Sequence, residues 1–117
     1  MAEVLQVVDF REYFPRLPER RLIWSNYVCA YMIDGLEGVQ VEKEVHTQVR
    51  VRLGEGSIGM GPRPEYLSIY FPGTQFTQEY RKKNGRCNTG KYTINLPYYD
   101  DEELETVKKL VWKALQV

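Results

Sequence analysis

The segment Gly54–Gly59 (GEGSIG) has the spacing GxGxxG, which is typical of a turn that holds a dinucleotide pyrophosphate. In such a site the last glycine opens a helix whose N-terminus meets the pyrophosphate. Here the next residues are Met60–Pro64 (MGPRP), and this proline-containing stretch cannot begin an ordinary helix. We therefore interpret Gly54–Pro64 as a flexible loop and not as a nucleotide site.

The residues that could act as nucleophiles, general bases or metal ligands are scattered along the chain. His46 is the only histidine, and the two cysteines, Cys29 and Cys87, form no CxxC pair. Nucleophilic catalysis needs a base beside the nucleophile, and a metal site needs several ligands at short spacing. The acidic run Asp100–Glu105 is better explained as the start of a helix, where negative charge is favourable. The sequence therefore predicts no catalytic residue, no metal and no cofactor.

Basic and aromatic residues occur together between Thr74 and Tyr99. This stretch has five basic residues and one acidic residue, although the whole chain, with 16 of each, is neutral. Cations follow the phosphates of a nucleic-acid strand, and aromatic rings stack on its bases for about 1–3 kcal/mol each. The candidates for phosphate contacts here and on a neighbouring strand are Arg50, Arg52, Arg81, Lys82, Lys83, Arg86 and Lys91. The candidates for base stacking are Tyr66, Tyr70, Phe76, Tyr80 and Tyr92.

We therefore predict binding of single-stranded RNA or DNA without strong sequence specificity. A duplex-binding module would be expected to be strongly basic overall, which this neutral chain is not. The same residues have a second explanation, because basic residues at a hairpin tip protect sheet edges and tyrosines are common in sheets. Exposed tyrosines also suit a protein partner, so a protein–protein interaction module or assembly subunit is the alternative. Trp112, which lies off the apolar stripe of its helix, is the candidate for a homo-oligomer contact.

Two helices and about four strands are expected to position these residues. Apolar residues recur at helical spacing in Glu19–Ile33 and in Asp100–Leu115. The first helix has its apolar stripe at Leu22, Ile23, Tyr27, Ala30 and Ile33, and the second is capped by Asp100. The predicted strands are Val39–Leu53, Tyr66–Phe71 and Lys91–Leu96, together with a hairpin of Phe76–Lys83 and Arg86–Cys87 around the turn Asn84-Gly85.

The stretch Val39–Leu53 has the clearest pattern in the chain. Its odd positions are mostly apolar, with Lys43 and Thr47 as exceptions, and its even positions are all polar, including His46, Arg50 and Arg52. Alternation at a period of two places these sets on opposite faces of a sheet. One face is therefore expected to be core, and the other to face solvent or a ligand.

These elements predict one α+β domain, residues 1–117, with a four-stranded antiparallel sheet and helices packed on one face. The second face would be partly open and would bind the nucleic acid. No apolar run approaches the ~20 residues that span a bilayer, and the N-terminus lacks the features of a signal peptide. We therefore expect a cytoplasmic protein.

The layout of the chain resembles that of the small archaeal ThermoDBP-related single-stranded nucleic-acid-binding proteins. The shared features are a helical N-terminal third, a mainly antiparallel sheet rich in Tyr and Arg, and the C-terminal helix DDEELETVKKLVWKAL. The resemblance is one of layout and includes no diagnostic motif. It implies a cleft on the sheet that binds single strands without strong sequence preference, and assembly through helices.

Overall fold

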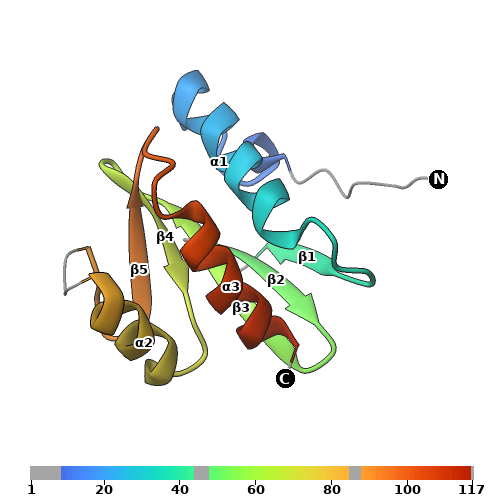
Figure 1. Cartoon of the computed structure of the whole chain (residues 1–117). Coiled ribbons are helices and arrows are strands. Elements are labelled where there is room, and N and C mark those ends of the chain that lie inside the picture. The colour runs from blue at the N-terminus through green and yellow to red at the C-terminus, as the bar shows by residue number, and fades with distance from the viewer. Residues whose placement is uncertain (1–8, 44–47, 85–87, 117) are drawn as a thin grey trace.

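The computed structural model describes residues 9–43, 48–84 and 88–116. They form a five-stranded antiparallel sheet whose strands lie side by side in sequence order, with three α-helices on one side of the sheet (Figure 1). The strands are β1 (Gln40–Lys43), β2 (Val49–Leu53), β3 (Gly56–Pro62), β4 (Tyr66–Tyr70) and β5 (Thr93–Pro97). The helices are α1 (Glu19–Ile33), α2 (Thr74–Asn84) and α3 (Leu104–Leu115), and the short 3-10 helix η1 (Phe10–Glu12) precedes them. The predicted α+β class is confirmed, with five strands in place of four.

The stretch predicted as one long strand, Val39–Leu53, contains two strands, β1 and β2, which pair antiparallel. In their register Val41 lies opposite Val51, and Glu42 lies opposite Arg50. Paired positions are both odd or both even, so the alternation of the two faces continues across the pair. The predicted face assignment therefore survives the correction: Val49 and Val51 are buried, while Arg50 and Arg52 are partly exposed.

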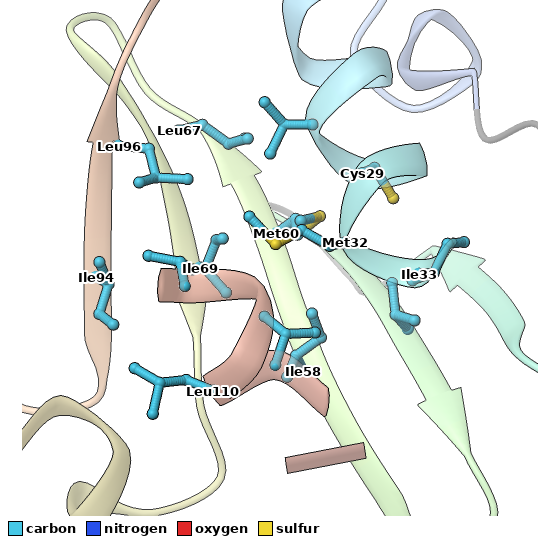
Figure 2. Close-up of a cluster of buried hydrophobic side chains, with 14 of the residues drawn as sticks. Cys29, Met32, Ile33, Ile58, Met60, Leu67, Ile69, Ile94, Leu96 and Leu110 are labelled. Atoms are coloured by element: carbon cyan, nitrogen blue, oxygen red, sulfur yellow. The ribbon is translucent and has the colours of Figure 1, made fainter. Parts of the chain in front are cut away.

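The stretch Gly54–Pro64, predicted as a flexible loop, contains strand β3, which lies at the centre of the sheet between β2 and β4. Ile58 and Met60 point into the core (Figure 2). Gly56 points to the same side, and a Cβ atom there would lie 2.3 Å from the carbonyl oxygen of Leu115. Glycine at this position therefore lets the last turn of α3 pack directly on the strand.

The residues predicted as a hairpin around Asn84-Gly85 begin with a helix, α2, that connects β4 to β5. Phe76 and Tyr80 are one helical turn apart, and both are buried with about 6% of their surface exposed. The Phe76 ring stacks on that of Phe71 at a centroid distance of 5.4 Å. Burial of this apolar pair holds α2 against the sheet and explains why the helix forms here.

Helices α1 and α3 pack against each other and cover the middle of the sheet (Figure 1). Helix α1 has the predicted bounds, but its buried side is rotated from the predicted stripe: Met32 is buried, whereas Ile23 and Tyr27 are exposed. Helix α3 begins at Leu104 and not at Asp100, whose carboxylate accepts a hydrogen bond from the backbone N–H of Glu102 (3.0 Å) in the preceding turn. None of the described helices is long and apolar enough to cross a membrane.

Candidate nucleic-acid interface

The side of the sheet away from the helices carries polar and tyrosine side chains, and we call it the outer face. It is formed by the positions that alternate with the buried ones along the strands. In register order it comprises Gln40 and Glu42 on β1, Arg50 and Arg52 on β2, Ser57, Gly59 and Gly61 on β3, Tyr66, Ser68 and Tyr70 on β4, and Thr93, Asn95 and Pro97 on β5. Four of the twelve predicted binding residues, two arginines and two tyrosines, therefore share one surface.

The two arginines of β2 are held by polar partners on the neighbouring strands. Arg50 donates a hydrogen bond from Nη1 to Ser57 Oγ, 3.1 Å away on β3. Arg52 forms an ion pair with Glu42 on β1 at an N···O distance of 3.6 Å, and about 41% of its side chain stays exposed. An exposed pair of this kind is worth little to folding, so the Arg52 guanidinium can exchange its partner for a phosphate at low cost.

On β4 the outer face is built around a contact between Tyr70 and Arg63. The Arg63 guanidinium carbon lies 5.5 Å from the centroid of the Tyr70 ring, and Arg63 Nη2 donates a hydrogen bond to the Tyr70 hydroxyl. Small residues occupy the adjacent register pair, Gly61 and Ser68, and the Ser68 hydroxyl donates to Asn95 Oδ1 at 2.7 Å. The result is a cation and an aromatic ring in contact on one surface.

Arg63 was absent from the predicted site because its segment was interpreted as a loop. It follows the last residue of β3, and its backbone N–H donates to the carbonyl oxygen of Tyr66 (2.8 Å). The Tyr98 hydroxyl donates to the carbonyl oxygen of Arg63 at 2.7 Å, which fixes the turn between β3 and β4. Partial burial raises the pKa of Tyr98 above its usual range.

The predicted residues of α2 lie on the other side of the sheet, in the helical layer. Two of the candidates for base stacking, Phe76 and Tyr80, are buried, so their rings belong to the core and do not face the outer surface. Arg81 fastens the segment after α2, because it donates hydrogen bonds to Thr89 Oγ1 and to the carbonyl oxygen of Gly90, both at 2.9 Å. The remaining two, Lys82 and Lys83, are exposed on α2. They are therefore separated from the outer face by the sheet.

Of the other predicted residues, Lys91 and Tyr92 are exposed in the segment before β5, with the Lys91 ammonium 5.5 Å from the Tyr92 ring centroid. Arg86 lies outside the described residues, as do His46 and Cys87. The described residues of the predicted site thus fall into three groups: those on the outer face, those in the helical layer, and the pair Lys91 and Tyr92 before β5.

The Trp112 side chain forms contacts within its own chain. Its indole N–H donates to the carbonyl oxygen of Met32 at 2.9 Å, which connects α3 to the end of α1. The Lys108 ammonium lies 5.5 Å from its ring and 4.5 Å from the ring of Tyr31. The sequence pattern placed Trp112 off the buried stripe correctly, but its half-buried ring has partners in its own chain.

A second aromatic cluster, which the sequence analysis missed, lies beside the start of α1. The Trp24 ring contacts Tyr98 edge-on at a centroid distance of 5.6 Å and Tyr99 at 6.3 Å. Two arginine side chains lie over the tyrosines, Arg20 at 4.8 Å from Tyr99 and Arg21 at 5.4 Å from Tyr98. The signal for this cluster was the pair of tyrosines after Pro97, since a tyrosine ring with an accessible face is a ready partner for arginine.

An open cleft of about 450 Å³ lies next to this cluster. Its walls are the aromatic and proline residues of segment 13–18, the side chain of Arg21, and the turn at residues 62–64. Arg63 both lines this cleft and contacts Tyr70, so it joins the cleft to the outer face.

Three features with possible chemical roles are the Cys29 thiol, the metal-ligating side chains and the GxGxxG segment. Burial raises the pKa of Cys29 to about 12, so its thiol stays protonated and inert. Among residues 9–43, 48–84 and 88–116 there is no group of three or more metal-ligating side chains. The GxGxxG segment runs into strand β3 and not into a helix, so it lacks the helix N-terminus that holds a pyrophosphate.

Comparisons with protein-family models, with curated proteins and with solved structures found no significant match to this chain.

Proposed function

We propose that the protein binds single-stranded nucleic acid across the outer face of its sheet, without strong sequence preference. The observation that carries this proposal is the gathering of Arg50, Arg52 and Arg63 with Tyr66 and Tyr70 on one side of the sheet. One acidic residue, Glu42, forms an ion pair with a member of this group, Arg52, and offsets part of its charge. The surface therefore combines cations for phosphates with aromatic rings for bases, which suits a single strand.

Each type of residue has a separate role in this proposal. The guanidinium groups contact phosphate oxygens and contribute an affinity that weakens with salt. The rings of Tyr66 and Tyr70 stack on bases, and this contribution tolerates any sequence because every base has a π-face. The side chains of Ser57, Ser68 and Asn95 on this face are short, whereas the Gln48 side chain covers Gly59 between Arg50 and Tyr70.

The proposal is tested with a fluorescently labelled single strand of about 20 nucleotides, whose anisotropy is titrated at several salt concentrations. The test variant is Arg50→Gln/Arg63→Gln, which removes two charges from the outer face. The matched control is Lys82→Gln/Lys83→Gln, which removes the same charge from the exposed surface of α2. Circular dichroism verifies that both variants stay folded.

If each arginine neutralises one phosphate, the slope of log affinity against log salt becomes shallower by about 1.4 in the test variant. The control variant should keep the slope of the wild type. Undetectable binding of the wild type at low salt would refute the proposal. An equal loss of affinity in the two variants would also contradict it, because it would show that binding depends on the total charge of the protein and not on a site on the outer face.

Tyr66→Leu separates stacking from charge. It should weaken binding by about 1–3 kcal/mol and leave the salt slope unchanged, because it removes a ring but no cation. Unchanged affinity would exclude Tyr66 from the interface.

A further inference from the structure

The side of α1 that points away from the core carries apolar residues at one-turn intervals, two of them exposed and the third, Tyr31, partly buried. Ile23, Tyr27 and Tyr31 follow each other at i, i+4 and i+8, which places them on one face of the helix. Ile23 is 58% exposed and Tyr27 is 49% exposed. The rings of Tyr27 and Tyr31 lie nearly parallel with centroids 6.4 Å apart. We call these three residues the α1 face.

Opposite charges flank the α1 face. Arg20 lies one turn before Ile23, and Asp34 lies one turn after Tyr31, and both side chains are exposed. This order is unfavourable within a single helix, because a helix dipole favours negative charge at its N-terminus and positive charge at its C-terminus. A second helix running in the opposite direction would reverse the order and place each charge beside its complement.

We propose that the α1 face is a self-association surface, on which a second copy of the chain docks with its α1 antiparallel about a two-fold axis at Tyr27. In this register Tyr27 meets its own copy, Ile23 of each chain meets Tyr31 of the other, and Arg20 of each chain meets Asp34 of the other. Every apolar residue of the face gains an apolar partner, and both ends gain an ion pair. An isologous contact of this kind closes as a dimer and does not propagate.

The surroundings of Tyr31 give the second copy a place to insert. An open cavity of about 480 Å³ lies between the end of α1 and α3, and its walls include Tyr31, Asp34 and Trp112. In the antiparallel register, Ile23 of the second copy lies at the mouth of this cavity. The exposed isoleucine of each copy would thus meet the Tyr31 and Trp112 rings of the other copy, in a cavity whose remaining walls are the charged residues Asp34, Glu105, Lys108 and Lys109.

The size of the contact sets its expected strength. Helix α1 has 15 residues and is thus roughly 22 Å long. A single helix pair of that length buries less than the roughly 800 Å² per partner of a standard stable interface. The dimer should therefore be reversible and depend on protein concentration.

The test is sedimentation velocity over a concentration series, with circular dichroism to establish that each variant is folded. The wild type should shift from monomer to dimer as its concentration rises. Tyr27→Ser should remain monomeric, while the control Tyr92→Ser, at a tyrosine of similar exposure on another surface, should dimerise like the wild type. A wild type that stays monomeric throughout the series, or a Tyr27→Ser variant that dimerises normally, would overturn the proposal.

A charge exchange tests the register itself. Arg20→Asp and Asp34→Arg each place like charges together at both ends of the dimer, so each variant alone should associate about tenfold more weakly than the wild type. An equimolar mixture of the two restores an opposite pair at each end and should dimerise as well as the wild type. A mixture that associates no better than the separate variants would contradict the antiparallel register.

Discussion

Replacing Gly56 by alanine tests how closely α3 packs on the sheet. The added Cβ would lie 2.3 Å from the carbonyl oxygen of Leu115 and 2.5 Å from that of Ala114. Ordinary contacts begin near 3.4 Å, so the last turn of α3 and strand β3 must separate by about 1 Å. Neither obstacle is a flexible side-chain end, so rotation of a side chain cannot relieve the clash.

The expected cost follows from what that turn buries. Overpacking in a close-packed interior costs about 1–3 kcal/mol. Leu115 and Ala114 are 1% and 0% exposed, and complete exposure of a leucine side chain would cost about 1.5–3 kcal/mol. Because a 1 Å displacement loses only part of this burial, we expect Gly56→Ala to lower the free energy of unfolding by about 2 kcal/mol.

The assay is urea unfolding followed by circular dichroism, in which the midpoint should fall while the slope m stays constant. The control is Gly54→Ala, where the new Cβ meets nothing within 4 Å but φ is +58°. That variant has only the strain of a left-handed alanine, about 1 kcal/mol. A loss at Gly56 no larger than the loss at Gly54 would refute the close packing of α3 on β3.

Two further predictions concern the contact between α1 and α3 and the thiol of α1. Trp112→Phe keeps a ring but removes the N–H that donates to Met32, so the free energy of unfolding should fall by about 1 kcal/mol in the same urea assay; an unchanged midpoint would show that this hydrogen bond contributes nothing. In a Cys87→Ser background, Cys29 should react with a thiol reagent only after denaturant is added, because burial raises its pKa to about 12. Rapid modification of the native protein would contradict its burial.

The sequence pattern correctly predicted which residues of β1 and β2 face the core, but it did not predict that they form two strands. Antiparallel partners such as Val41 and Val51 have the same parity, so a period of two looks the same in one long strand and in two paired strands. Residues 44–47 (EVHT) contain no Gly, Pro, Asn or Asp to indicate a turn. The length of the pattern was the available warning, because strands usually have 3–10 residues.

Helix α2 was missed because a turn signal was given more weight than helical spacing. Asn84-Gly85 is typical of a hairpin turn, but Asn and Gly also commonly end helices. The residues before it include strong helix formers, and Phe76 and Tyr80 have the i, i+4 spacing of a buried helical pair. This error moved the basic residues of α2 onto the predicted binding face, whereas the structure places them in the helical layer.

The outer-face residues were accessible to sequence reasoning only where a strand was correctly identified. Alternation in β2 and β4 placed Arg50, Arg52, Tyr66 and Tyr70. Arg63 could be placed on this face only if β3 was known to be a strand, and its glycines obscure that strand in the sequence. Gly56 is required by packing because a Cβ there would meet the backbone of α3, whereas a Cβ at Gly59 would meet the movable end of the Gln48 side chain. Such contacts between distant segments have no local sequence signal.

The most direct test of the proposed function is the backbone amide NMR spectrum of the protein during titration with an unlabelled single strand of about 20 nucleotides at low salt. We predict shifts concentrated in β2, in β4 and at Arg63, with little change in Lys82 and Lys83 of α2. Absence of shifts at saturating oligonucleotide, or shifts confined to the helical layer, would contradict nucleic-acid binding by the outer face.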